Sequence, residues 1–491
     1  MEQNKNPDIS EEHYIRVDKV KELQKNGISA YPAGKPTNTT CAEIIDAFKE
    51  DSESPEYAVA GRLLTVREHG KTMFATIQDR TGKVQIYIRK DMVGDETFEF
   101  IQHYIDIGDI VWVQGHSFKT KMGEVTVKVS AFALQSKCLH PLPEKFHGLS
   151  DIETKYRQRY LDLITDAESR ERFKIRSAII RTMRNFFDNH DFIEVETPML
   201  HPIPGGAAAK PFVTHHNALD AELYLRIAPE LYLKRLVVGG FERVYEINRN
   251  FRNEGISTRH NPEFTMVEWY VAYKDYHWMM DFIEELIKKV IKESGLSEQI
   301  QYDEHLIDFS TFERLSMKAS VMKYVGIDED ALDNDIDAVL KELHISTKNK
   351  DASWGEKLLA IFEEKVESQL IQPTFITDYP VEVSPLSKRD AQNPAIAARF
   401  ELFIAGMELA NGFNELNDPF DQAERFQQQA QARTSGDDEA HYYDADYVLA
   451  LEHALPPTVG AGMGIDRLTM LLTNTQSIKD VILFPTLKKK D

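Results

Sequence analysis

Apolar residues repeat with a helical period near the start of the 491-residue chain and with a strand period soon after it. Between Ser10, which can cap a helix, and Gly27, which can end one, apolar side chains recur every three to four residues. From about residue 58 to residue 134, five short runs alternate apolar and polar positions and are separated by Gly and Asp. Five strands of this kind predict a small barrel of the OB type.

The rest of the chain mixes helical and strand patterns, which predicts an α+β fold. The stretch LHPLPEKFHGLS, with its Pro and Gly residues, is typical of an interdomain connector. After it, a long helical pattern runs into the strand-like IEVETPML. We therefore expect a helix and barrel in residues 1–145, a connector at 146–165, and a large domain at 166–491 with a mainly helical insertion around 280–367.

The stretch FRNEGISTRHNPEFTMVEWY joins a cationic loop to an alternating strand. Because side chains alternate across a strand, Phe264, Met266, Glu268 and Tyr270 share one face. At roughly 3.3 Å per residue, Phe264 and Glu268 lie about 13 Å apart on that face. The face therefore presents an aromatic ring at one end and a carboxylate with a phenol at the other.

Arg252, Arg259 and His260 precede this strand. A hairpin here would hold these cations over an anionic ligand, with a nucleotide stacked on Phe264 and a small cationic molecule near Glu268. Alternating Phe, Met and Tyr is equally the pattern of an ordinary buried strand, and Glu268 alone also fits a solvated or ion-paired residue.

Two further stretches favour ligand binding. In GAGMGIDR, the glycines Gly460, Gly462 and Gly464 allow a close backbone approach, although any tight turn can use glycines. Arg467 follows at the start of an apolar helical run and is more specific, because a planar guanidinium can bind phosphate or stack on a base.

In FELFIAGMELANGFNEL, Glu401 and Glu408 flank a short Ala-Gly turn. Two carboxylates beside phosphates can bind Mg²⁺, which prefers oxygen ligands, but two exposed hairpin glutamates would have the same sequence. Glu408 and Glu415 have opposite parity, so strict alternation would not place both on one face; a bulge, for example near Gly412, would correct this.

Composition narrows the function classes. Apolar residues make up 42% and charged residues 28% of the chain, as in soluble enzymes. No run approaches the ~18 apolar residues of a membrane span, and the polar N-terminus lacks a signal core. The two cysteines, Cys41 and Cys138, fit a reducing cytosol, so we expect a cytoplasmic protein away from membranes. The net charge of −22 argues against nucleic-acid binding unless specific motifs provide it.

Several stretches together resemble the signature motifs of class II aminoacyl-tRNA synthetases. RSAIIRTMRNFFDNHDFIEVETPML is similar to motif 1, FRNEGISTRHNPEFTMVEW to motif 2 and GAGMGIDR to motif 3. Their order and the N-terminal barrel match subclass IIb, which comprises the lysine, aspartate and asparagine enzymes. Strings such as PIPGGAAAKPF, RIAPELYLKRL and ELANGFNELNDP are similar to its bacterial-type lysine branch, and the resemblance covers nearly the whole chain.

The resemblance implies an OB-fold anticodon-binding domain before a catalytic domain built on an antiparallel sheet flanked by helices. It implies an ATP-dependent ligase that forms lysyl-adenylate and pyrophosphate from lysine and ATP, then transfers lysine to the 3′ end of tRNA(Lys). It also implies a homodimer with motif 1, residues 176–200, in the interface. Displacement at phosphorus needs positioning and neutralised charge more than a protein nucleophile, which fits the absence of an obvious catalytic triad.

By the same resemblance, Arg252 and Arg467 are the catalytic residues, and Arg252 holds the α-phosphate and the lysine carboxylate. The implied ATP site is Arg252, His260, Asn261, Phe264 and Arg467. Phe264 would lie under the adenine and Arg467 over its other face. Glu401 and Glu408 would hold Mg²⁺, with up to about three ions per subunit.

The implied lysine site is Gly206, Glu230, Glu268, Tyr270, Asn411 and Glu415. A buried ammonium needs an anionic partner, and Glu268 and Glu415, beside Tyr270, would receive the ε-ammonium. Glu230 and the Gly206 backbone would meet the α-amino group, and Asn411 the carboxylate. An aspartate or asparagine pocket would need a cation or an amide donor at its far end, so the carboxylates disfavour those relatives.

On the barrel, the resemblance implies that Arg67, Phe74, Gln85 and Glu124 read the anticodon, with Phe74 stacked on the central uracil. Unpaired bases stack on aromatic rings and expose their pairing edges to hydrogen bonds. Each of these residues alone also fits ordinary barrel packing.

Three alternatives stay open. The first is a synthetase for aspartate or asparagine. The second is a catalytically silent relative that only binds RNA or regulates, which the complete set Arg252, Glu401, Glu408 and Arg467 disfavours. The third is an enzyme that lysylates a protein, whose relatives lack the N-terminal barrel.

Overall fold

The structure, a computed structural model, describes residues 10–50, 53–143, 151–347, 351–434 and 442–489. The chain divides into two compact units, residues 1–150 and 151–491, and each has a hydrophobic core of its own. Within the described ranges, no helix has the length and apolar character needed to cross a membrane.

The first unit is a closed five-stranded barrel in the order β1-β2-β3-β5-β4, which confirms the predicted OB-type barrel. Its strands are β1 (Glu56–His69), β2 (Thr72–Gln78), β3 (Lys83–Arg89), β4 (Ile110–Lys119) and β5 (Val125–Ser136). Its helices are α1 (Glu11–Lys25), α2 (Cys41–Asp46), α3 (Lys90–Val93) and α4 (Asp95–Tyr104). Every second residue of β2 and β3 is buried in the barrel, so the alternate residues face outward.

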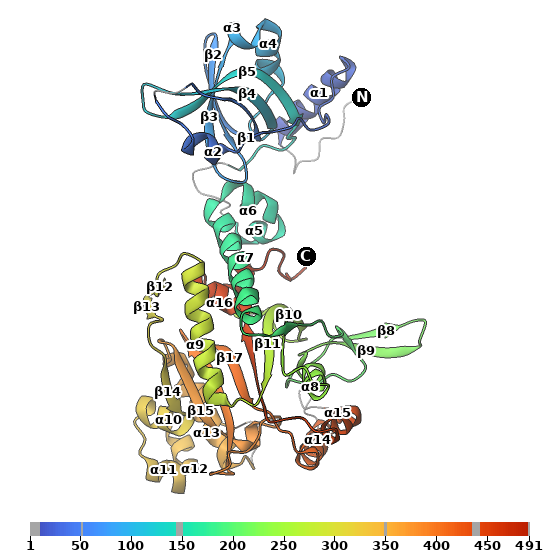
Figure 1. The fold of residues 1–491 in the computed structure, drawn as a ribbon, viewed down its shortest axis with the longest axis vertical. Helices are drawn as coiled ribbons and strands as arrows, with labels where there is room; N and C mark the ends of the chain where they lie inside the picture. The colour runs from blue at the N-terminus through green and yellow to red at the C-terminus, as the bar shows by residue number, and fades with distance from the viewer. Residues whose placement is uncertain (1–9, 51–52, 144–150, 348–350, 435–441, 490–491) are drawn as a thin grey trace. The chain divides into compact units, whose positions relative to one another are not determined.

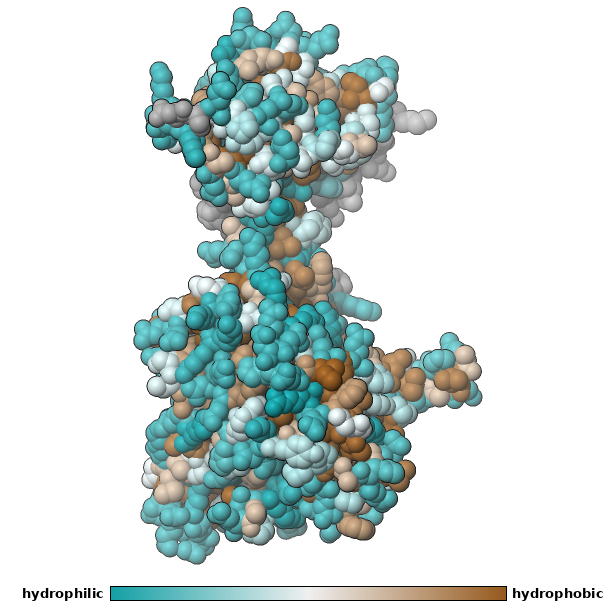
Figure 2. All heavy atoms as spheres, viewed as in Figure 1, coloured by the Kyte–Doolittle hydropathy of each residue, from teal (hydrophilic) through white to brown (hydrophobic). Residues whose placement is uncertain are grey.

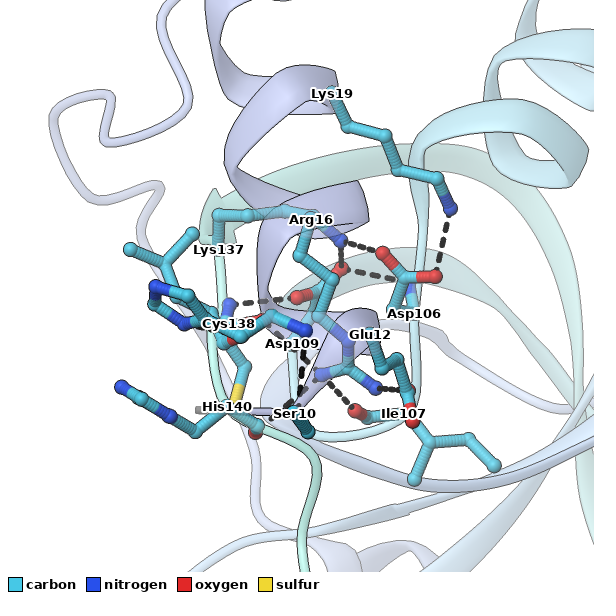
Figure 3. A network of polar contacts seen from close by, with 12 residues as sticks. Ser10, Glu12, Arg16, Lys19, Asp106, Ile107, Asp109, Lys137, Cys138 and His140 are labelled. Carbon is cyan, nitrogen blue, oxygen red and sulfur yellow. Dashed lines mark hydrogen bonds and ion pairs between the residues drawn. The ribbon is translucent and has the colours of Figure 1, made fainter. Parts of the chain in front are cut away.

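The predicted N-terminal helix is α1, and the Ser10 side chain caps it by accepting a hydrogen bond from the backbone of its first turn. Buried charges fix this helix against the barrel (Figure 3). Arg16 donates to three backbone carbonyls of the barrel unit. Beside it, the fully buried Lys137 ammonium contacts Asp106 and lies 2.7 Å from Asp109. Buried cations are tolerated here because each is paired.

The second unit is built on an eight-stranded sheet in the order β14-β15-β16-β17-β18-β11-β10-β6. Its strands are β6 (Ile193–Glu194), β10 (Arg243–Phe251), β11 (Glu263–Ala272), β14 (Glu313–Ser316), β15 (Thr374–Pro380), β16 (Ile396–Ile404), β17 (Met407–Asn414) and β18 (Thr458–Gly464). Neighbours are antiparallel except at the two edges, where β14 and β6 pair in parallel. The expected antiparallel sheet is therefore confirmed. A small separate sheet contains β7 (Leu200–His201), β8 (Val213–His216) and β9 (Ala221–Leu225).

Helices α7 (Ala167–Asp188), α9 (Tyr276–Glu293) and α16 (Ile465–Leu472) share the main core with this sheet. Figure 1 shows α7 and α9 lying beside each other along the sheet. Val267, Trp269 and Val271 of β11 belong to this core, so the alternate residues of the strand face away from it. The other helices are α5 (Ile152–Arg157), α6 (Arg159–Thr165), α8 (Glu230–Val238), α14 (Pro419–Thr434), α15 (Ala445–Glu452) and α17 (Ile478–Val481).

The segment 280–367, expected to be mainly helical, consists mostly of helices and also carries three short strands. It contains the hairpin β12 (Gln299–Tyr302) and β13 (His305–Asp308), and its strand β14 extends the main sheet. Helices α10 (Met317–Val325), α11 (Glu329–Asn334), α12 (Ile336–Glu342) and α13 (Trp354–Lys365) form a separate core. Of the expected connector, residues 146–150 lie outside the described residues, while α5 and α6 belong to the second unit.

Candidate active site

The second unit contains a cavity of about 370 Å³. Its walls come from β11 and the loop before it, from β17 and β18, and from the starts of α8 and α16. The residues predicted for catalysis, ATP and lysine all line it: Gly206, Glu230, Arg252, His260, Asn261, Phe264, Glu268, Tyr270, Asn411, Glu415 and Arg467. Chain segments far apart in sequence therefore meet at one cavity.

The floor of the cavity includes one face of β11. Phe264, Met266, Glu268 and Tyr270 all line the cavity, as the alternation predicted. The strand lies between β10 and β18 and is paired on both edges, which fixes the direction of these side chains.

The loop between β10 and β11 supplies the cationic end of the cavity. Arg252 follows directly on β10, and its guanidinium carbon lies 5.1 Å from the centre of the Phe264 ring. Its Nε is buried and has no hydrogen-bond partner among the residues described. Burial also lowers the pKa of Arg252, because the charged form is partly desolvated. A guanidinium with unused, buried donors is well suited to bind an anion.

Arg467, in the first turn of α16, joins this cationic end. It donates to the Glu408 backbone carbonyl, lies 3.3 Å from a Glu408 carboxylate oxygen, and lies 3.2 Å from Nε2 of His260. Because a guanidinium only donates, Nε2 accepts, and Nδ1 carries the proton that it gives to Ser257 at 3.0 Å. Burial, together with the Arg467 charge, lowers the pKa of His260, so its imidazole is neutral near pH 7.

Close packing explains two glycines of GAGMGIDR. A Cβ on Gly460 would lie 2.3 Å from a Glu415 carboxylate oxygen and from the Tyr270 ring. A Cβ on Gly462 would lie 2.7 Å from the Met266 methyl group. Gly460 and Gly462 therefore leave room for the side chains of the neighbouring strands.

Three buried carboxylates, Glu230, Glu268 and Glu415, line the same cavity. The Tyr270 hydroxyl donates to one oxygen of Glu268 at 2.6 Å. Burial, followed by the neighbouring Glu230 charge, raises the pKa of Glu268 to about 8. Burial raises the pKa of Glu415 to about 8 as well. Carboxyl groups of this kind ionise readily when a cation enters beside them.

Lys234, which sequence reasoning did not single out, lies behind this acidic end. Its ammonium is fully buried, 2.7 Å from Glu230 and 2.6 Å from Glu415. Glu230 and Lys234 are four residues apart on α8, which is a detectable pairing signal. The pairing with Glu415 joins positions 181 residues apart and leaves no signal in local sequence patterns.

The other predicted contacts are small polar groups on the cavity wall. Gly206 adopts φ +89°, and a Cβ there would lie 2.9 Å from Cβ of Glu230, so its backbone passes close to the base of that side chain. The Asn411 side chain is 3.3 Å from the Arg399 guanidinium. Asn261 donates to the Glu263 carbonyl at 2.6 Å, and its buried Oδ1 has no partner within the described ranges.

Glu408 and Glu415 do line one cavity, but the expected position of the bulge is wrong. The register shift lies between Leu402 and Phe403, which pair with Ala410 and Glu408, so Leu409 is the extra residue. Gly412 pairs regularly with Phe400. The bulge forms next to the tight turn at residues 405–406, where the pairing begins.

The two predicted metal ligands differ in their surroundings. Glu401 lies outside the cavity lining and is held by Arg399 and, at 2.8 Å, by the Tyr379 hydroxyl. Burial raises the pKa of Glu401 to about 7, the Arg399 charge opposes this, and the Glu408 charge adds to it. Glu408 lines the cavity and is partly exposed. No group of three metal-ligating side chains occurs in the described part of the chain, so this pair fits Mg²⁺ only with oxygens supplied by a ligand.

Of the four predicted anticodon residues, Arg67, Phe74 and Gln85 lie on the neighbouring strands β1, β2 and β3, and Glu124 directly precedes β5. Arg67 pairs with Phe74 across β1 and β2, and Gln85 donates to Glu124 at 2.7 Å. Phe74 is stacked on Tyr87, with ring centres 4.6 Å apart. Tyr87 was not predicted, although the alternation in KVQIYIR places it on the same face as Gln85. The barrel thus carries an outward aromatic pair beside polar side chains.

The sequence matches two protein-family models that follow the two units. Residues 151–488 match the tRNA synthetases class II (D, K and N), and residues 57–134 match the OB-fold nucleic acid binding domain.

Similar proteins extend over the full length of the chain. It is 53% identical to the lysine–tRNA ligase of Carboxydothermus hydrogenoformans, over 97% of this chain and 98% of that protein. It is 51% identical to the lysine–tRNA ligase of Magnetococcus marinus, over 100% of both chains. A third lysine–tRNA ligase, from Pelotomaculum thermopropionicum, is 53% identical over 99% of this chain and 96% of its own length.

Proposed function

Because the chain belongs to the class II tRNA synthetases (D, K and N), we propose that it is a lysine–tRNA ligase. It activates L-lysine with ATP to lysyl-adenylate and pyrophosphate, then transfers lysine to the 3′ end of tRNA(Lys). The observation that carries the choice of lysine is the convergence of Glu230, Glu268 and Glu415 on one cavity. An ammonium taken from water needs such partners, whereas an aspartate side chain would meet like charge.

ATP occupies the cationic end. The adenine stacks on Phe264, and Arg467 covers its other face and reaches toward the γ-phosphate. Arg252 holds the α-phosphate, and its buried Nε, which has no partner among the described residues, is available for this. His260 and Asn261 complete the contacts, and the neutral imidazole of His260 binds without adding charge.

Lysine occupies the acidic end. Its ε-ammonium lies between Glu268 and Glu415, next to the Tyr270 hydroxyl that orients Glu268. Its α-ammonium meets Glu230 and the Gly206 backbone. Asn411 and Arg252 hold its carboxylate and direct it toward the α-phosphate.

Activation is an in-line displacement at phosphorus. A lysine carboxylate oxygen bonds to the α-phosphorus, the bond from this phosphorus to the bridging oxygen breaks, and pyrophosphate leaves with the electron pair. Arg252 compensates the charge that develops on the α-phosphate oxygens. In the second step a hydroxyl of the terminal tRNA ribose attacks the lysyl carbonyl carbon, and AMP leaves.

Mg²⁺ would be held by Glu408 and Glu401 together with phosphate oxygens. When bound, it would neutralise part of the triphosphate charge. Arg399 and Tyr379 keep Glu401 in place, and Arg467 does the same for Glu408. The number of ions per subunit, up to about three, is part of this proposal.

The barrel binds the anticodon of tRNA(Lys). Phe74, backed by Tyr87, offers a stacking surface to the central uracil. Arg67, Gln85 and Glu124 supply charge and hydrogen bonds to the neighbouring bases.

The active enzyme is a cytoplasmic homodimer that uses motif 1 in its interface. In support, apolar side chains are exposed along residues 193–213, among them Ile193, Met199, Leu200 and Val213. Hydrophilic residues cover much of the face in Figure 2, and hydrophobic ones gather where the β8–β9 hairpin leaves the second unit. Exposed apolar patches of this kind mark interaction surfaces.

Aminoacylation with purified tRNAs tests this function. With ATP and Mg²⁺, the protein should attach labelled lysine to tRNA(Lys) and should attach neither aspartate nor asparagine to their own tRNAs. Charging of tRNA(Asp) or tRNA(Asn) in place of tRNA(Lys) would contradict the proposal.

A further inference from the structure

A fully buried lysine of the protein bridges two of the acids that line the cavity. The Lys234 ammonium lies 2.7 Å from Glu230 and 2.6 Å from Glu415, and Lys234 itself is not among the lining residues. The Phe413 and Tyr447 rings enclose it at 5.7 and 5.6 Å. The ammonium is therefore fixed behind the cavity wall.

Lys234 pairs with one oxygen of Glu415 and, among the described residues, leaves the other unpaired. It occupies Oε2 of Glu415, whose Oε1 is buried with no hydrogen-bond partner in the described structure. On β11, Tyr270 likewise occupies one oxygen of Glu268. Partners inside the protein thus determine which carboxylate oxygens stay unpaired.

The same contacts determine the net charge at the acidic end of the cavity. Glu230, Glu268 and Glu415 bring three negative charges when ionised, and Lys234 compensates one. Arg399, which also lines the cavity, is paired with Glu401, so two negative charges remain at this end. They match an amino acid with two ammonium groups. The substrate carboxylate is left to Arg252 at the other end.

We propose that Lys234 is a specificity-determining positioning residue, which orients Glu230 and Glu415 and fixes the charge of the cavity to match a diammonium amino acid. The inference rests on the proposed lysine activation. Without Lys234, Glu230 and Glu415 have no cation between them, and the two acids would share a proton and bond to each other. Substrate lysine would then have to break that pair.

A double-mutant cycle in lysine-dependent ATP–pyrophosphate exchange tests this role. Lys234→Met should raise KM for lysine by at least about tenfold and leave KM for ATP within about twofold. Adding Glu415→Gln removes the surplus acid, and the Gln amide can donate to Glu230. The double variant should therefore lose about tenfold less lysine activation than the two single-variant losses multiplied together.

Lys137→Met is the matched control. Lys137 is equally buried and also bridges two acids, Asp106 and Asp109, but it lies in the other unit (Figure 3). Its replacement should lower the melting temperature and leave both KM values unchanged. A change in lysine KM as large as that of Lys234→Met would show that loss of any buried lysine is enough, and would overturn the proposal.

The remaining outcomes also decide the matter. Additive losses in the double variant, or equal rises of both KM values in Lys234→Met, would overturn the role of Lys234. If Lys234→Met does not fold, the double variant should fold and activate lysine within about tenfold of Glu415→Gln alone. If the double variant also fails to fold, or folds without activity, the proposal is wrong. Failure of the wild type to activate lysine would instead refute the proposed function.

Discussion

Glu268→Gln isolates the charge at the far end of the β11 face. Glu268 is 5% exposed, lines the cavity, and accepts a hydrogen bond from Tyr270. Glutamine keeps the size of the side chain and an oxygen for Tyr270, so packing should change little. The substrate ε-ammonium loses a charge-assisted hydrogen bond. Removing one partner of a buried pair costs ~2–5 kcal/mol, so lysine activation should fall roughly 30-fold to several thousand-fold.

The structure adds a pH dependence to this loss. The pKa of Glu268 in the empty cavity is about 8, so at pH 7 the wild type must first release a proton to bind lysine. One pKa unit corresponds to roughly a tenfold change. Above pH 8, lysine activation by the wild type should therefore exceed that by Glu268→Gln by the full factor. At pH 7 this ratio should be about tenfold smaller.

Lysine and ATP constants for the folded variant, measured by pyrophosphate exchange at pH 7 and 8.5, test this reasoning. ATP binding should hardly change, because Phe264 lies about 13 Å from Glu268 along the strand. Glu263→Gln is the control, since it removes the same charge from the same strand outside the cavity. Normal lysine activation in Glu268→Gln, or an equal loss of ATP affinity, would mean that Glu268 is only structural.

Three further predictions concern binding and assembly. Phe74→Ala should weaken tRNA charging by the ~1–3 kcal/mol of one stacked base and leave pyrophosphate exchange intact, and an equal fall in both assays would refute the anticodon role. Lysine KM in the wild type should fall as pH rises from 7 to 8.5, because lysine binding ionises Glu268 and Glu415, whose pKa values are about 8; a flat profile would contradict this. Sedimentation should show a dimer, whose interface we expect to bury over ~2,000 Å². A stable, active monomer at micromolar concentration would refute the motif 1 interface.

Local periodicity predicted the elements in which one face is buried and the other is not. The barrel strands and the cavity face of β11 follow from strict alternation, because one side of each strand is buried. The bulge at Leu409 was misplaced to Gly412, because its position depends on the adjacent turn and not on the glycine. The short strands within 280–367 carry few residues each, too few for a clear period.

Local sequence patterns could not predict contacts between segments that are distant in the chain. Lys234 meets Glu415 only because α8 and the end of β17 are brought together by the sheet. Likewise, the hydrogen bond from the Tyr379 hydroxyl to Glu401 joins β15 to β16. Sequence motifs indicated which residues gather at the cavity, and only the structure shows which partners each carboxylate already has.

ATP–pyrophosphate exchange with each of the twenty amino acids shows most directly whether the protein activates lysine. We expect strong exchange with lysine alone, because only lysine places ammonium groups at both Glu230 and the Glu268–Glu415 pair. Exchange that depends on aspartate or asparagine, or no exchange with any amino acid in the folded protein, would contradict it.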